Sequence, residues 1–152
     1  MICDFVLKGG AFVSTMNYIA AAARAGLKIA AVHWRKYELN VESPLNPTFY
    51  DACLKYGISI LTPGDEVRTT NVLIGYPAVL QNIPDRFPKI EADNVIVLIN
   101  QFATRLVDGS DRQYEPEVIR QHLVELFGTS GTWIPISHWV KRLMQELSLI
   151  HI

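Results

Sequence analysis

Several features that would reveal a functional class are missing from this chain of 152 residues. No apolar run approaches the roughly 20 residues of a membrane-spanning helix, and Met1 leads straight into a predicted strand without a signal peptide. The 14 Lys and Arg residues nearly balance the 15 Asp and Glu residues, for a net charge of -1. This balance offers no electrostatic basis for binding nucleic acid. We therefore expect a cytoplasmic protein with neither a membrane span nor a nucleic-acid partner.

Cysteines and metal-binding patterns are also scarce. The two cysteines, Cys3 in a predicted strand and Cys53 in a predicted helix, indicate buried thiols in a reducing compartment. No His, Cys or acidic pair has chelating spacing, so we expect no metal cofactor. The Gly-x-Gly-x-x-Gly and Walker patterns of nucleotide-binding loops are absent as well. None of the common motifs therefore identifies a reaction or a catalytic residue.

What the chain does have is an alternation of short apolar strands with amphipathic helices. Apolar segments predict strands at residues 2–7, 28–34, 58–61, 71–75, 94–99 and 132–136, with helices at 14–25, 47–56, 116–127 and after Ser137. This pattern is typical of an α/β fold, a doubly wound, mostly parallel sheet of about six strands with helices on both faces. The nine residues from Thr62 to Thr70 are short for a parallel crossover and form the weakest connection of this topology.

Local signals mark several helix ends. Asn46 and Pro47 supply an N-cap and a first-turn proline for the second helix, which Gly57 closes. Ser14 and Ser137 are expected to cap the first and last helices.

The last residues, Leu147 to Ile152, carry no cap, turn or charge pattern that would close a domain. We therefore assign residues 1–147 to a single domain and exclude residues 148–152 as a non-native or frayed tail. The tail also predicts that the natural chain continues past roughly Gln145 to Leu147.

Topology alone selects the places where a ligand is expected. In a doubly wound sheet, ligands bind beyond the carboxyl ends of the strands, near the point where the strand order reverses. The segments at these ends should converge on one rim: Lys8-Gly9-Gly10, His33-Trp34-Arg35, Tyr76-Pro77, Asn100-Gln101 and Ser137-His138.

The glycine pair is the first candidate. Gly9 and Gly10 stand where the first strand gives way to the first helix, and glycine permits a positive φ and a close approach of ligand to backbone. A helix N-terminus with free N–H groups favours anions such as phosphate. A tight turn that binds nothing is an equally good interpretation of the pair.

The other rim residues are polar. His33 would suit a general base or a ligand contact, although a histidine hydrogen-bonded at the edge of the core is the favoured interpretation. Tyr76, Asn100 and Gln101 suit a hydroxyl-rich ligand, unless they merely begin a helix or cap a turn. His138 follows the last helix cap and would reach the same rim.

Three further residues are expected to pack rather than to bind. His122 lies among apolar neighbours of a predicted helix, and Trp133 and Trp139 are interpreted as core residues rather than as a platform for stacking sugars.

Three stretches together resemble the N-terminal Rossmann-like domain of bacterial GT-B glycosyltransferases. They are residues 3–33 with Gly9-Gly10, residues 73–80 and residues 90–101, and the pattern continues through residues 114–128 and 133–137. The resemblance covers nearly the whole chain up to about Leu147. Relatives often have His where this chain has Tyr76, so no imidazole is expected at that position.

The resemblance implies transfer of a sugar from a nucleotide-sugar donor to an acceptor hydroxyl, with no metal required. In such enzymes the N-terminal domain mainly holds the acceptor, while its glycine loop contacts the phosphates of the donor. Gly9 and Gly10 match that loop. The acceptor-side candidates are the polar residues of the rim, namely His33, Tyr76, Asn100, Gln101 and His138.

The resemblance also implies that a donor-binding C-terminal domain is missing. A lone acceptor-side domain should fold without turning over substrate, because transition-state stabilisation needs groups from both walls of the cleft. Two alternatives stay open. One is a stand-alone Rossmann-like module that holds a small anion without catalysis, and the other is a folded remnant with no activity.

Overall fold

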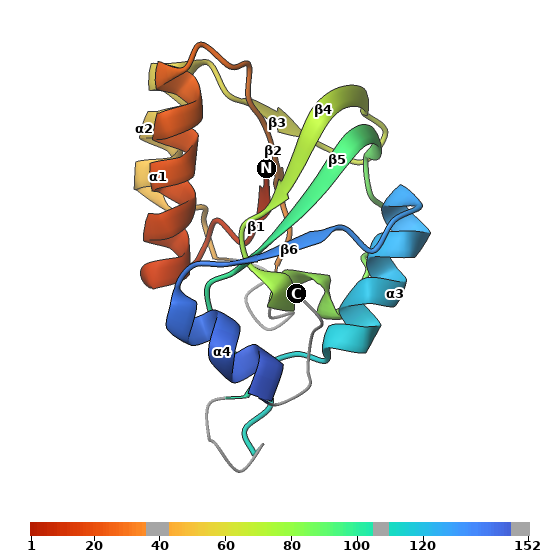
Figure 1. Ribbon diagram of the computed structural model, residues 1–152. Helices are drawn as coiled ribbons and strands as arrows, with labels where there is room; N and C mark the ends of the chain where they lie inside the picture. Colours follow the sequence, from red (N-terminus) through yellow and green to blue (C-terminus); the bar gives the residue numbers. More distant parts are fainter. Residues whose placement is uncertain (36–42, 105–109, 147–152) are drawn as a thin grey trace.

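The protein is described here by a computed structural model covering residues 1–35, 43–104 and 110–146 (Figure 1). In chain order its elements are β1 (Ile2–Cys3), α1 (Gly10–Arg24), β2 (Ala30–His33), α2 (Pro47–Tyr56), β3 (Ser59–Leu61), β4 (Glu66–Ile74), the 3-10 helix η2 (Pro77–Gln81), β5 (Lys89–Ile99), α3 (Pro116–Phe127), β6 (Thr132–Pro135) and α4 (His138–Glu146). The predicted tail at residues 148–152 lies outside the described residues, as do residues 36–42, 105–109 and 147.

The strands form one six-stranded sheet in the order β3-β2-β1-β4-β5-β6, and every neighbouring pair is parallel. The predicted α/β fold with a doubly wound parallel sheet is therefore confirmed. The strand order reverses between β1 and β4, which is the switch point of a Rossmann-like fold. Cys3 is in register with His33, and Ile2 with Ile74, so β1, β2 and β4 end at one edge of the sheet.

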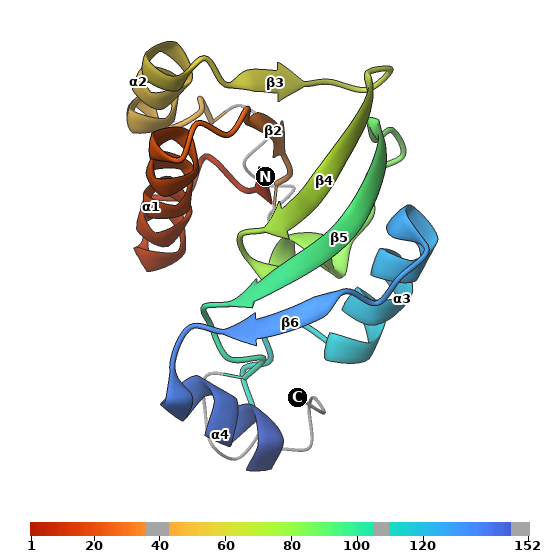
Figure 2. The same ribbon diagram turned by 45° about the horizontal axis from the view of Figure 1, so that its top comes forward.

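Each face of the sheet has its own core, because successive strand residues point to opposite faces. Cys3 points toward α1 and α2, where Phe5 and Phe49 stack with their ring centroids 3.8 Å apart. Ile2 points to the other face, where Ile119 and Leu123 of α3 lie in the same buried cluster. Figures 1 and 2 show α1 and α2 on one side of the sheet and α3 on the other.

The first helix begins earlier than predicted. α1 starts at Gly10, its N-cap is Gly9, and no side chain caps it. Ser14 therefore lies inside the helix, and the prediction that it caps α1 was wrong. The reason is tertiary: Phe12 and Thr15 are buried against the sheet, and burying a large apolar side chain stabilises by about 1.5–3 kcal/mol, more than the roughly 1 kcal/mol of a cap.

The fourth and fifth strands are also longer than predicted, since they begin at Glu66 and Lys89. Their first halves are polar and exposed on one side, so apolar runs could not reveal them. These halves form a two-stranded ribbon that extends toward the end of β3 (Figure 2). The chain thus passes from β3 to β4 through a short turn, in which Asp65 Oδ2 accepts the Thr62 N–H at 2.6 Å. Because the ribbon brings the start of β4 close to the end of β3, the few residues between them are enough to connect these two strands.

The remaining helix ends follow the local signals. Asn46 Oδ1 accepts the Thr48 N–H at 3.0 Å at the start of α2. Gly57 and Gly128 close α2 and α3 in the left-handed region, with φ of 63° and 70°. Ser137 Oγ accepts the Val140 N–H at 3.2 Å at the start of α4. Among the helices described here, none is long and apolar enough to cross a membrane.

Candidate functional site

β1 ends at Cys3, earlier than predicted, and a loop of residues 4–9 leads from it to α1. The first N–H groups of this loop bind side chains. The Val6 N–H donates to Oδ1 of Asp4 at 3.0 Å, and the Phe5 N–H donates to Nδ1 of His33 at 3.1 Å. Asp4 is buried, with 2% of its surface exposed. The loop is therefore held from within by its own aspartate and from β2 by a histidine.

Asn46 holds the same loop from the opposite side. Its backbone N–H donates to the Phe5 carbonyl at 2.8 Å, and its Nδ2 donates to the Leu7 carbonyl at 3.3 Å. Because Asn46 is also the N-cap of α2, one side chain joins the loop to a helix. Asp4 and Asn46 were not foreseen as loop-holding residues. One local signal pointed to Asp4: an aspartate often accepts the backbone N–H two residues later in a turn, here that of Val6.

Gly9 and Gly10 are exposed at the N-terminus of α1, and neither adopts a positive φ. A Cβ atom at either position would meet nothing within 4 Å beyond its immediate surroundings in the chain. Neither backbone conformation nor packing thus requires glycine here. The first turn of α1 holds no acidic residue and no capping side chain, so its N–H groups retain the partial positive charge of a helix N-terminus.

The packing of α1 brings this glycine pair close to the switch point. A Cβ atom on Gly75, just beyond β4, would lie 2.6 Å from Thr15 Oγ1 and 3.3 Å from Cys3 Sγ. The helix therefore touches the end of β4 at Thr15. Gly10 lies five residues before Thr15, which corresponds to about 7.5 Å along the helix axis.

His33 lies at the end of β2, and 17% of its side chain is exposed. Burial lowers the pKa of His33 below 6.5, and Arg35 lowers it further, while the nearby Asp4 raises it. Its Nδ1 accepts the Phe5 N–H, and its buried Nε2 has no hydrogen-bond partner. The imidazole is thus a neutral acceptor that shapes the loop, in agreement with the favoured interpretation of a histidine at the edge of the core.

Tyr76, Asn100 and Gln101 meet at the ends of β4 and β5. The Tyr76 hydroxyl donates to Gln101 Oε1 at 2.6 Å, and Asn100 Nδ2 donates to the Gly75 carbonyl at 2.6 Å. Tyr76 is only 2% exposed, whereas Asn100 and Gln101 are half-buried. Tyr76 therefore orients the side chain of Gln101, while the Asn100 amide ties the end of β5 to Gly75.

Tyr114 completes this group, since its hydroxyl donates to the Gln101 carbonyl at 2.9 Å. Burial, and to a lesser degree Tyr76, raise the pKa of Tyr114 well above its usual range, so it remains a neutral donor. Asn100 Oδ1 is buried and has no hydrogen-bond partner. The network holds Gln101 firmly and leaves one amide oxygen of Asn100 unpaired.

The last predicted rim residue, His138, is exposed as the first residue of α4. The Ile136 N–H donates to the Ile99 carbonyl at 3.2 Å, which ties the segment before α4 to the end of β5. The next residue, Trp139, is 66% exposed. Its predicted place in the core was wrong, because α4 turns Val140 and Met144 inward instead. Trp133 is buried as predicted.

The other expected packing residues are partly buried. His122 Nδ1 lies 2.6 Å from the Leu80 carbonyl, so this histidine joins α3 to η2. Cys3 is buried as predicted, while Cys53 is only partly so.

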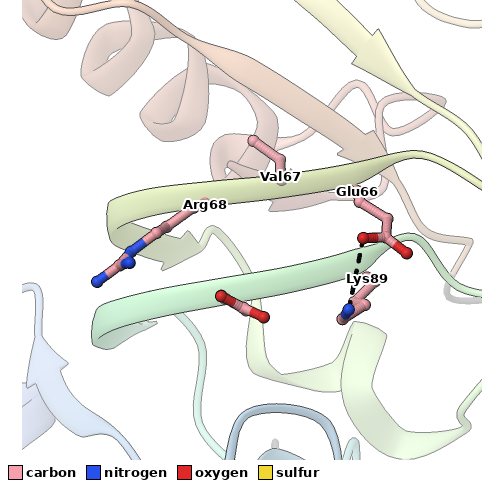
Figure 3. A pocket seen from close by; sticks show the side chains of 5 residues that line it. Glu66, Val67, Arg68 and Lys89 are labelled. Carbon is pink, nitrogen blue, oxygen red and sulfur yellow. Dashed lines mark hydrogen bonds and ion pairs between the residues drawn. The ribbon is translucent and has the colours of Figure 1, made fainter.

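A hollow of about 160 Å³ lies away from this rim, between the first halves of β4 and β5. Glu66 and Lys89 form an ion pair of 3.4 Å here, drawn as a dashed line in Figure 3, and Arg68 points away from that pair. Charges of both signs line it, and it is smaller than the roughly 300–1,000 Å³ of ligand pockets. It belongs to the ribbon and not to the candidate site.

Among the described residues, no group of three or more His, Cys, Asp or Glu side chains is placed to hold a metal ion. Comparison of the chain with models of known protein families, with curated proteins and with solved structures found no match.

Proposed function

We propose that this chain is the acceptor-side domain of a GT-B glycosyltransferase, an enzyme that moves a sugar from a nucleotide-sugar donor to an acceptor hydroxyl. The observation that carries the proposal is the exposed, uncapped start of α1 at Gly9 and Gly10, beside the β1–β4 switch point. No contact within the described part of the chain requires these glycines, whereas a phosphate that approaches the backbone would.

In this proposal the two sides of the switch point have different roles. Residues 9 and 10 would contact the donor phosphates through backbone N–H groups, held in place by the bonds of His33 and Asn46 to the loop. The amide of Gln101 would bind an acceptor hydroxyl on the β5 side. In this proposal the described residues supply binding and orientation, and the donor nucleotide is bound by a second domain.

The test begins with the source DNA beyond the codon for residue 152. We expect the reading frame to continue into a second α/β domain, and its full product to release a nucleoside diphosphate from a nucleotide sugar. Gly9→Val and Gly10→Val should lower this rate at least about tenfold by blocking the phosphate contact. Ala21→Val, on the exposed side of α1, adds similar bulk away from the site and should leave the rate unchanged.

The alternative, a stand-alone module for a small anion, predicts a different result. A stop codon after residue 152, together with calorimetric binding of pyrophosphate that Gly9→Val and Gly10→Val abolish, would replace the glycosyltransferase proposal by this one. If neither pyrophosphate nor a nucleotide sugar binds, the chain is an inactive remnant.

A further inference from the structure

Trp139 is an exposed aromatic residue in a rigid setting. Its side chain is 66% exposed, while Trp34 and Trp133 are buried. Leaving a large aromatic ring in water forgoes the stabilisation that its burial would give. The exposure does not come from a loose helix, because Val140 and Met144 of α4 are buried in the core.

A second aromatic ring holds Trp139 in position. The rings of Phe102 and Trp139 lie 5.0 Å apart at an interplanar angle of 72°, an edge-to-face contact. Phe102 is half-buried and packs against the main core. Phe102 therefore holds the indole in place, because Phe102 itself packs against the core, and the rest of the indole faces solvent.

A polar side chain, that of Gln101, directly precedes Phe102 in the sequence. Its Oε1 is occupied by Tyr76, and its Nε2 has no hydrogen bond within the described part of the chain. A fixed amide donor just after β5 thus directly precedes the phenylalanine that supports the exposed indole of α4.

These groups match the chemistry of a sugar ring. One face of a pyranose carries weakly positive C–H groups that suit the negative face of an indole, and its hydroxyls both donate and accept hydrogen bonds, as amides do. We propose that Trp139, supported by Phe102, is a stacking platform for a sugar ring of the acceptor, with the Gln101 amide as its hydrogen-bond donor. This inference rests on the proposed glycosyltransferase function and adds the class of acceptor.

Saturation-transfer NMR on the chain tests the platform with methyl β-glucoside, methyl β-galactoside and N-acetylglucosamine as probes. We expect at least one probe to receive saturation, most strongly at the C–H groups of one ring face. Trp139→Ala should weaken its binding on the order of tenfold, and Trp139→Phe should restore part of it. Leu54→Ala is the matched control, because Leu54 is 86% exposed on α2.

Two results would overturn the platform. One is the absence of saturation transfer to all three probes at millimolar concentration, with circular dichroism showing a folded chain. The other is a concentration-dependent sedimentation coefficient that Trp139→Ala abolishes, which would make Trp139 a contact between copies of this chain. Sugar binding through Trp139 without nucleotide-sugar turnover by the full product would instead keep the platform and refute the glycosyltransferase proposal.

Discussion

The Nδ1 atom of His33 accepts a hydrogen bond of 3.1 Å from the backbone N–H of Phe5. A protonated imidazole has no acceptor, so this contact exists only while His33 is neutral. The loop that leads to Gly9 and Gly10 is thereby linked to the protonation state of a residue on the neighbouring strand.

The first prediction concerns pH. Burial and Arg35 keep the pKa of His33 below 6.5 in the folded chain, so the unfolded chain binds more protons as the pH falls through this range. Folding stability contributed by neutral His33 should be fully present above pH 6.5 and lost as the pH falls through the lowered pKa. His33→Asn keeps an acceptor near Phe5 without titrating. Urea unfolding between about pH 5 and pH 8 should show a smaller loss for this variant, and equal losses would contradict the role of His33.

The second prediction concerns the close approach of α1 to β4. Gly75→Ala should destabilise the fold by about 1–3 kcal/mol, because the new Cβ would lie 2.6 Å from Thr15 Oγ1. The double variant with Thr15→Ala should recover part of this loss in chemical denaturation. Gly10→Ala is the control, since a Cβ there meets nothing within 4 Å. A Gly75→Ala protein as stable as the wild type would refute the contact.

The third prediction separates two roles of Asn46. Asn46→Ala should cost about 1 kcal/mol through the lost cap alone and should also free the Leu7 carbonyl. Asn46→Asp keeps the capping oxygen but lacks the amide donor. We expect Asn46→Asp to retain most of the stability of α2 while the backbone amide signals of Gly9 and Gly10 shift in NMR spectra. Unchanged glycine signals in both variants would show that the Asn46 side chain does not hold the loop.

The fourth prediction concerns the orientation of Gln101. Tyr76→Phe removes the hydroxyl that donates to Gln101 Oε1 at 2.6 Å and should cost about 1 kcal/mol. Combined with Gln101→Leu, the effects should be less than additive, because the two side chains share one hydrogen bond. Tyr50→Phe, at a tyrosine that is 47% exposed, should change the free energy of unfolding little. Strict additivity in urea unfolding would argue against the bond.

Much of the fold could be predicted because its signals are local. Asn46-Pro47 and Gly57 begin and end α2 as expected, since capping and left-handed glycine depend on a few neighbouring residues. The alternation of apolar strands and helices was enough for the parallel sheet. The rim residues followed from topology, because parallel strands place their carboxyl ends at one edge.

What was missed depends on contacts between distant segments. The start of α1 is decided by Phe12 and Thr15 packing on the sheet, and Ser14 gave a misleading local signal. The polar halves of β4 and β5 show no apolar run. The bond of Asn46 to Leu7 joins residues 39 positions apart, and no short-range pattern records such a contact.

The charged pairs on the ribbon also determine how β4 and β5 align. Glu66 lies opposite Lys89, and Arg68 lies opposite Glu91. Sliding one strand by two residues would place Glu66 against Glu91 and Arg68 against Asp93, and sliding it the other way would place Arg68 against Lys89, so each error loses an attractive pair and creates a repulsive one. A slip of one residue would turn the charged side chains to the opposite face. The long ribbon can therefore form in one alignment while most of its length remains in water.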